Sequence, residues 1–446
     1  MRILIAGAGE VGTHLAKLLS NEDFDITLID PDPARLEQAS HRLELLAIQA
    51  NPTSLKDLQE AGVSNTDLFI SVTPEESTNL TASILASRLG AKRTLARINN
   101  HEYLTPDNMT FFENLGINSM IYPEELAADE IYAAIRYPWA RQFIELFNGS
   151  LILVGVKVRN GAELVGKYLH ELGKDNNKVF HIVAIKRDLE TIIPSGNTRV
   201  EHGDVVFFTC APDQISTVRS IAGKRNPTVH KVVIMGASRT ALRAIARIPK
   251  NINVCLIERN KEKCIKLSSV LPSEVKLYHG DGRDPDLLKE IGLNETDVFI
   301  ALTENSETNV MACLSAKRYG VFKTVAKEEN IDYIHLAYGL DIGTLINKKL
   351  ITAGHIFRML LGADSSTVKC LSVANADVAE LIAKRDSKVI AKPIKELNLG
   401  NNITFGGMVR NGVPMMIDGD TVLEPYDHVA VFCHDISMNQ LKDLFN

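Results

Sequence analysis

Short apolar runs alternate with stretches of helical spacing through the first hundred residues of the chain. The apolar runs have the length of buried strands and lie at residues 2–6, 25–29, 45–49, 67–72 and 93–96. Helical patterns follow Glu10, Pro33, Ser54 and Glu75. Strands that alternate with helices are typical of βαβ units, so this region predicts a Rossmann-like, doubly wound parallel sheet.

The pattern of the chain changes after this first region. Residues 150–158, 178–186 and 205–210 alternate apolar and polar positions and are rich in β-branched side chains, with short helical pieces between them. This predicts a small α+β lobe. Residues 123–143 have a helical pattern that is broken at Pro138, and we interpret them as the joint between sheet and lobe.

An internal repeat organises the whole sequence. Residues 62–90 match residues 292–320 at a constant offset of 230, and twelve of these 29 positions are identical. Residues 192–208 resemble residues 415–432, where Gly196 pairs with Gly419 and Asp204 with Asp427 at an offset of 223, which is half of the 446 residues. The chain is therefore a tandem duplication, and we predict an α/β fold of two Rossmann-like parallel sheets, each followed by a small α+β lobe.

The repeat also sets the expected domain boundaries. We predict a first Rossmann-like domain, a crossover helix, a first lobe, a second Rossmann-like domain and a second lobe. Their expected ranges are 1–124, 125–143, 144–225, 230–348 and 365–446.

A glycine motif that fits a dinucleotide site follows the first strand. It reads Gly7-Ala8-Gly9-Glu10-Val11-Gly12 and opens a helix, which is the context that this motif requires. Gly7 would permit the tight turn, Gly9 would let the backbone approach a pyrophosphate, and Gly12 would let helix and strand pack closely. The helix N-terminus would present free N–H groups to the phosphates. The alternative is a glycine-rich turn that binds nothing.

Other candidate ligand-binding residues lie at the carboxyl ends of the predicted strands. Asp30 follows Gly12 by 18 residues and would accept from ribose hydroxyls, which favours NAD over NADP. Thr73 could bond ribose or phosphate, or it could simply cap a helix. The remaining candidates at these strand ends are Asn51, Pro74 and Arg97, and Arg97 could pair with phosphate or be a solvated charge. The Glu10 carboxylate would repel bound phosphates, which predicts a modest affinity of this loop for a nucleotide.

The second copy of the motif has diverged. It reads Gly236-Ala237-Ser238-Arg239-Thr240-Ala241 and keeps only the first glycine. Ser238 adds a side chain where close approach is needed, although Arg239 could bring a positive charge to a phosphate. Glu258 retains the acid that would read a ribose. A structural pseudo-site and a second, differently tuned nucleotide site both remain open.

Composition and charge exclude several classes of function. The net charge of −6 argues against a nucleic-acid binder that works through bulk charge. Six cysteines without a CxxC pair, and histidines without metal spacing, argue against a disulfide framework or a metal site. The sequence contains no apolar run of 18 residues, so it predicts no membrane-spanning helix. A Tyr319…Lys323 pair matches a YxxxK pattern, but Gly320 would break the helix that aligns the two side chains.

The arrangement of domains resembles the TrkA family, the nucleotide-binding regulatory subunits of Trk potassium uptake systems, whose repeating units are called RCK domains. The resemblance covers essentially the whole chain. It rests on GAGEVG at Gly7, ITLIDPD at Ile26, SVTPEESTN at Ser71, YPEELAADEIYAAIRYP at Tyr122 and LIERN at Leu256.

The resemblance implies an NAD(H) site in the first half, with ATP or ADP as alternative ligands at either site. That site would involve residues 7–11, Asp30, Thr73, Pro74 and Arg97, and a second would involve residues 236–240 and Glu258. Ser238 and Ala241 depart from the family's glycine motif, and Asn51 departs from the residue type common after the third strand.

The resemblance also implies a partner and an assembly. We expect a soluble, cytoplasmic, non-enzymatic regulator on the inner face of the membrane, bound to a membrane-embedded potassium channel or transporter subunit as a homo-oligomer, by resemblance a tetramer. The segments 123–137 and 348–361 carry two apolar faces, so they would either cross over to pair nucleotide domains or pack only on their own sheets. The alternative function is an NAD-dependent oxidoreductase.

Overall fold

A computed structural model describes most of the chain in two compact units. The described residues are 1–20, 22, 24–41, 43–175, 179–188, 190–334, 340–361, 367–371, 376–397, 399–434 and 438–445. Lys178 and residue 365, where we expected a strand and the last lobe to begin, lie outside them. The first unit comprises chiefly Met1–Leu126 and Lys348–Leu360, and the second chiefly Ala127–Asn347 and most of the chain after residue 361.

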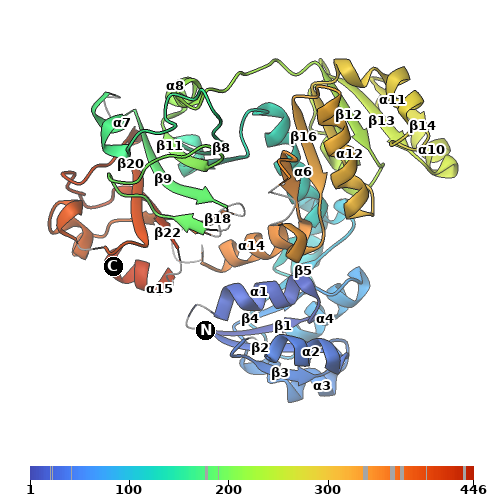
Figure 1. Cartoon of the computed structure of the whole chain (residues 1–446). Helices are drawn as coiled ribbons and strands as arrows, with labels where there is room; N and C mark the ends of the chain where they lie inside the picture. Colours follow the sequence, from blue (N-terminus) through green and yellow to red (C-terminus); the bar gives the residue numbers. More distant parts are fainter. Residues whose placement is uncertain are drawn as a thin grey trace. The chain divides into compact units, whose positions relative to one another are not determined.

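The first Rossmann-like domain is built on a six-stranded sheet in the order β3-β2-β1-β4-β5-β6, with parallel pairing throughout. This is the strand order of dinucleotide-binding folds. Its inner strands β4 and β5 are mostly buried because helices cover both faces of a parallel sheet. The strands, blue in Figure 1, are β1 (Arg2–Ala6), β2 (Asp25–Asp30), β3 (Leu46–Gln49), β4 (Leu68–Ser71), β5 (Arg93–Arg97) and β6 (Ser119–Ile121).

Polar caps start several of the helices that connect these strands. Asp32 accepts a hydrogen bond from the N–H of Ala34 at the start of α2, and Ser54 accepts one from Asp57 at the start of α3. The connecting helices are α1 (Glu10–Ser20), α2 (Pro33–Ser40), α3 (Leu55–Glu60), α4 (Glu76–Arg88) and α5 (Pro106–Asn114), and α6 (Pro123–Arg136) follows the last strand.

The second Rossmann-like domain repeats the first. Its parallel six-stranded sheet has the order β14-β13-β12-β15-β16-β17, which is the same topology. The strands are β12 (Lys231–Met235), β13 (Asn253–Glu258), β14 (Val275–His279), β15 (Val298–Ala301), β16 (Lys323–Lys327) and β17 (Thr344–Ile346). Its described helices are α9 (Arg239–Ile245), α10 (Lys261–Ser268), α11 (Pro285–Ile291) and α12 (Ser306–Arg318), and α14 (Lys348–Leu361) follows the sheet in the sequence.

Each small lobe contains a five-stranded antiparallel sheet, and the two sheets have equivalent strand orders, β10-β9-β11-β8-β7 and β21-β20-β22-β19-β18. The first lobe comprises β7 (Gln142–Leu146), β8 (Leu151–Lys157), α7 (Leu169–Asp175), β9 (Phe180–Arg187), β10 (Glu190–Ile192), β11 (Val205–Cys210) and α8 (Ile215–Ile221). The second comprises β18 (Thr367–Leu371), β19 (Ala376–Ile382), β20 (Ile403–Arg410), β21 (Val413–Met415), β22 (His428–Cys433) and α15 (Met438–Phe445).

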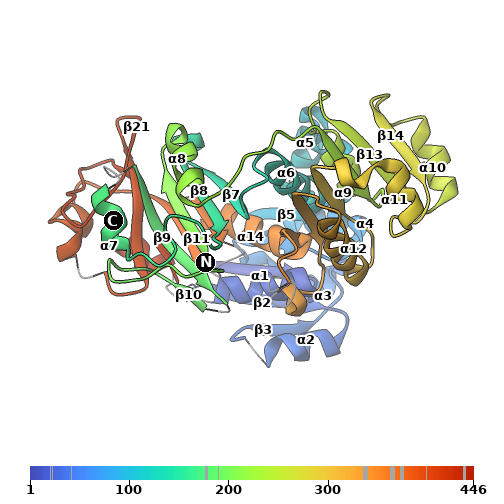
Figure 2. The ribbon, with the colours of Figure 1, turned by 45° about the horizontal axis from the view of Figure 1, so that its top comes forward.

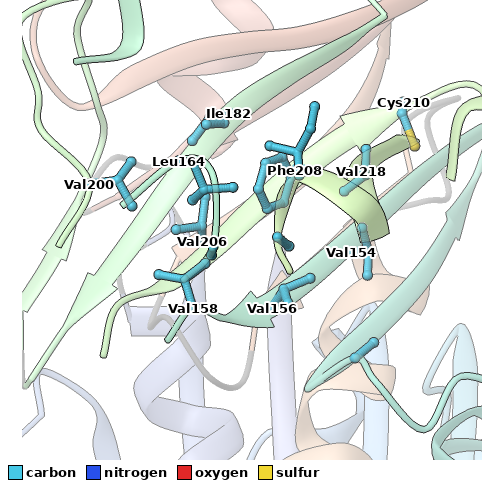
Figure 3. Packing of buried hydrophobic residues seen from close by; sticks show 14 of the residues in the cluster. Val154, Val156, Val158, Leu164, Ile182, Val200, Val206, Phe208, Cys210 and Val218 are labelled. Carbon is cyan, nitrogen blue, oxygen red and sulfur yellow. The ribbon is translucent and has the colours of Figure 1, made fainter. Parts of the chain in front are cut away.

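The lobes have both separate and shared apolar cores. Val154, Val156, Leu164, Val206 and Phe208 belong to the core of the first lobe (Figure 3). A second cluster joins Phe207 and Val183 of the first lobe to Phe432 and Val378 of the second. In Figures 1 and 2 the green strands of the first lobe accordingly lie beside the red strands of the second. The two lobes therefore form a single packed pair.

The joint between sheet and lobe differs from the sequence-based expectation. We expected a helical pattern over residues 123–143 with a break at Pro138, whereas α6 ends at Arg136 and a strand, β7, begins at Gln142. Pro138 explains the early end, because proline cannot donate the backbone hydrogen bond that a helix interior requires. The predicted helical range was therefore wrong over its last residues.

The helix α14 belongs to the compact unit of the first Rossmann-like domain, although it follows the second Rossmann-like sheet in the sequence. Within that unit, the Lys348 ammonium lies 3.1 Å from a carboxylate oxygen of Glu124. Of the two arrangements that the sequence left open, this helix adopts the crossover. None of the described helices is long and apolar enough to cross a bilayer.

Candidate functional site

The first glycine loop has the geometry of a phosphate-binding turn. Gly7 has a φ of +112°, and a Cβ there would lie 3.1 Å from the Thr73 nitrogen. A Cβ on Gly12 would lie 1.9 Å from the Gly7 carbonyl oxygen. These two glycines are therefore required by the fold itself, through backbone conformation and close packing.

Gly9 differs from the other two glycines of the loop. A Cβ at this position would meet no atom within 4 Å. Nothing in the packing of the described chain demands a glycine here, and the space above the backbone is open. An open approach to the backbone at the start of α1 is what a bound pyrophosphate requires.

Asp30 ties the end of β2 to this loop. Its side chain is buried, and its Oδ2 accepts a hydrogen bond of 2.7 Å from the backbone N–H of Ala8. Its Oδ1 accepts one of 2.9 Å from the N–H of Asp32. A carboxylate has about four acceptor positions. Asp30 therefore retains acceptor capacity for ribose hydroxyls while it fixes the loop.

Asn79 of α4 organises the neighbouring strand ends and was not among the residues singled out in the sequence. Its Oδ1 accepts hydrogen bonds from the Thr73 N–H and hydroxyl, at 2.9 and 2.7 Å. Its Nδ2 donates to the carbonyls of Thr73 and Arg97, at 3.0 and 2.9 Å. The amide is buried and clasps the ends of β4 and β5. Its identity with Asn309 in the repeat was the signal that could have found it.

The clasp brings Thr73 and Arg97 together at the carboxyl edge of the sheet. Thr73 does not cap α4, because Glu75 is the cap residue and the Thr73 hydroxyl bonds Asn79 and the Glu75 carbonyl. Arg97 is the last residue of β5, and Pro74 is exposed beside Thr73.

Asn51 is engaged in a local turn. Its Oδ1 accepts from the N–H and hydroxyl of Thr53, at 3.0 and 2.8 Å. Its own N–H donates to Asp57. The Asn51 amide oxygen thus stabilises the turn before α3, which provides a structural reason for this residue type.

Glu10 is paired with a cation. The Lys349 ammonium lies 2.5 Å from its Oε2. We expected the Glu10 carboxylate to weaken phosphate binding through repulsion. The ion pair offsets part of that negative charge at the loop.

The second loop keeps the backbone geometry but not the open approach. Gly236 has a φ of +94°, and its Cβ would lie 2.9 Å from the Thr303 nitrogen, as at Gly7. Ser238 replaces the open glycine, and its Oγ accepts a hydrogen bond of 3.3 Å from Ala241 at the start of α9. The Ser238 side chain and its hydrogen bond to Ala241 therefore occupy the position that Gly9 leaves open in the first loop. Arg239 and Thr240 follow as the first residues of α9.

Glu258 repeats the role of Asp30 in the second half. Its Oε2 accepts from the Ala237 N–H at 3.1 Å, and its Oε1 accepts from Asn260 at 2.8 Å. The Lys263 ammonium lies 3.2 Å away. Burial acts to raise the pKa of Glu258, but the hydrogen bonds from Asn260 and Ala237 and the charge on Lys263 hold it below its ordinary value.

The structure separates the Tyr319 and Lys323 side chains of the YxxxK pattern. Tyr319 is 48% exposed, whereas Lys323 is buried and donates to the Ala140 carbonyl at 2.6 Å. The two side chains therefore lie in different surroundings. Among the described residues, no cluster of three or more His, Cys, Asp or Glu side chains could hold a metal ion.

The paired loops, each with an acid hydrogen-bonded to it from the end of the second strand, define a tandem Rossmann-type protein of the nucleotide-binding class. The TrkA-N domain model matches residues 3–123 and 232–348, and the TrkA-C domain model matches residues 153–223 and 378–446. The chain belongs to the TrkA family.

Curated relatives match the chain over nearly its full length. The "Trk system potassium uptake protein TrkA" of Haemophilus influenzae is 32% identical, over 98% of this chain and 96% of its own. The protein of the same name from Halomonas elongata is 33% identical over the same shares. A TrkA homolog of Archaeoglobus fulgidus is 30% identical, over the whole of both chains.

Solved structures share the fold at lower identity. The GsuK RCK domain has a TM-score of 0.61 at 15% identity, covering 99% of this chain and 93% of that one. The GsuK channel bound to NAD has a TM-score of 0.60 at 16% identity, covering 99% of this chain and 78% of that one. These similarities extend over both Rossmann-like domains and both lobes.

Proposed function

We propose that this protein is a nucleotide-sensing regulatory subunit of a potassium uptake system. The observation that carries the proposal is the open backbone at Gly9 beside the buried Asp30, in a chain of the TrkA family. Nucleotide binding at this loop changes ion flux through a membrane-embedded transport subunit. A ligand can do this only if it binds two conformations of the protein unequally.

The first half holds the principal nucleotide, and NAD(H) is the ligand that best fits its acid at Asp30. Residues 7–12 bind the pyrophosphate, Asp30 accepts from the adenosine ribose, and Thr73, Pro74 and Arg97 line the adjoining strand ends. ATP or ADP share the adenosine that Asp30 reads. The loop at residues 236–240 forms a second nucleotide site with Glu258. Its ligand preference differs from that of the first site, because the Ser238 side chain covers the backbone that Gly9 leaves open in the first loop.

The repeating unit of this regulator consists of a Rossmann-like domain and a lobe. We place the units at residues 1–124 and 144–225, and at 230–348 and 365–446, with the crossover segment around α6 between the first two. The protein acts on the inner face of the membrane as a homo-oligomer. We propose a tetramer, because a symmetric ring of subunits can act together on one pore. Its role is regulatory and not enzymatic.

Calorimetric titration of the full-length protein with NADH, NAD, ADP and ATP tests nucleotide binding. Gly9→Val fills the open approach and should abolish binding at the first site, while Ser238→Val is the matched change in the second loop and should leave the first site intact. Equal binding by wild type and Gly9→Val would overturn the assignment of the first loop. Steady oxidation of NADH with a defined substrate and no partner would overturn the regulatory role.

Assembly and transport need separate measurements. Light scattering at micromolar concentration should report an oligomer, and a monomer with and without nucleotide would count against the ring. Rubidium uptake in cells that carry the transport subunit should depend on the presence of this protein and should change in Gly9→Val. Identical uptake with and without the protein would refute the regulatory role directly.

A further inference from the structure

The first nucleotide loop contacts a residue that lies 339 positions away in the sequence. The Lys349 ammonium of α14 is 2.5 Å from the Glu10 Oε2, and Glu10 is the first residue of α1. Both residues belong to the same compact unit. A helix that follows the second Rossmann-like sheet in the sequence therefore supplies a charge at the glycine loop of the first.

The position of Lys349 is fixed by its neighbours on α14. Lys348 pairs at 3.1 Å with Glu124, whose carboxylate is buried. The Thr352 hydroxyl donates to the Lys348 carbonyl at 2.6 Å, and Thr352 and Ile356 are fully buried. The first turn of α14 is thus anchored at this place, while the Lys349 side chain keeps its flexible stem and three donors.

The chemistry of the loop gives Lys349 a second possible partner. The N-terminus of α1 presents unpaired N–H groups and a positive dipole end, which attract phosphate oxygens. Phosphates bound there would repel the Glu10 carboxylate and attract the Lys349 ammonium. The Glu10 side chain is 55% exposed and can turn into solvent, and that of Lys349 is 27% exposed.

We propose that Lys349 is a phosphate-sensing residue of the first nucleotide site, which exchanges Glu10 for the nucleotide phosphates when the site is filled. Occupancy of the first loop is thereby transmitted to α14, the helix that precedes the second lobe in the sequence. The proposal rests on the proposed function, since it requires that a nucleotide occupies this loop. It adds a phosphate-binding residue that the glycine motif does not contain.

Three charge-removing variants of the full-length protein test this proposal by calorimetric titration with NADH and with ADP. Lys349→Met should weaken binding of both by about 2- to 5-fold, which is the range for one partly exposed charge near a helix terminus. Glu10→Gln should strengthen binding by a similar factor. Lys17→Met removes an exposed charge from the same helix α1 and should leave both affinities unchanged. Thermal unfolding verifies that each variant is folded.

Amide hydrogen exchange distinguishes phosphate sensing by Lys349 from a merely structural role, because a structural role would not make the exchange respond to nucleotide. Saturation with NADH should change amide exchange in the first turn of α14 in the wild type, and this change should vanish in Lys349→Met. Wild-type affinity together with a wild-type exchange response in Lys349→Met would overturn the proposal. Absence of any nucleotide binding by the wild-type protein would instead refute the proposed function, so the two failures are distinguishable.

Discussion

Arg187 holds Asp204 in a two-point ion pair at the base of the first lobe. Its Nε and Nη2 donate to the two carboxylate oxygens, each at 2.9 Å, and Asp204 is 1% exposed. Arg410 and Asp427 repeat the arrangement in the second lobe, at 2.8 and 2.6 Å. A planar guanidinium matches a carboxylate in this geometry, and lysine cannot.

Breaking the first of these pairs should strongly destabilise the lobe. Arg187→Met leaves a buried carboxylate without its cation, and we expect a loss of about 3–5 kcal/mol. Calorimetric unfolding should show a clear fall in melting temperature, while Arg225→Met at an exposed position should have almost no effect. The double variant Arg187→Met with Asp204→Leu should recover most of the loss, because the uncompensated charge is gone. A variant with unchanged stability would show that the pair is not structural.

The acid of the first site should contribute measurably to nucleotide affinity. Asp30→Ala removes the acceptor proposed for the ribose and should weaken NADH binding by about 1–3 kcal/mol. Asp32→Ala is the matched control, since Asp32 is an acid that caps α2 near the same loop. Unchanged affinity in folded Asp30→Ala would mean that another residue contacts the ribose.

The two asparagine clasps allow fold and binding to be separated. Asn79→Ala and Asn309→Ala each remove a buried amide that bonds two strand ends, and each should lower stability by about 2–4 kcal/mol. Only Asn79→Ala should weaken binding at the first loop, because only it releases Thr73 and Arg97. Titration of both variants with NADH, after unfolding curves, provides the comparison. Equal effects on binding would place the principal site elsewhere.

Lys224 should make stability depend on pH in the alkaline range. Burial, with the nearby Arg159 and Arg141, lowers the pKa of Lys224 to about 8. Between pH 8 and the ordinary value of about 10.4, the unfolded chain binds more protons than the folded one, so stability from this group rises with pH across that window. Lys224→Met should therefore stabilise the protein near pH 7, by about 1–2 kcal/mol for this half-buried charge, and should flatten the alkaline rise. Unfolding curves at pH 7 and pH 10 check both effects.

The sequence predicted the strands of the first domain closely, because a buried parallel strand leaves a continuous apolar run. β1 has the expected bounds, β2 differs from expectation by one residue at one end, and β4 differs by one residue at each end. The strand β6 was missed, since its three residues are too few to show a period. The repeat correctly predicted the tandem architecture, because both halves preserve the same core positions.

The candidate site was predicted where backbone geometry demands one residue type, and less well where side chains meet in space. Gly7 and Gly12 follow from turn and packing constraints that a sequence motif records directly. The Asn79 clasp joins two strand ends through one amide, so no local pattern indicates it. Lys349 reaches Glu10 only because a distant helix crosses to the first domain, which spacing along the chain cannot show.

The packed pair of lobes has a consequence for how such a regulator can diversify. The Thr209 hydroxyl of the first lobe donates to the Gly406 carbonyl of the second at 2.5 Å, and Phe207 and Phe432 share one core. A dimer of identical chains carries every substitution twice, so both of its loops change together. Here the same pairing is made within one polypeptide, and each loop is free to change alone. The two loops show this asymmetry, because Ser238 stands in the second loop at the position that Gly9 holds in the first.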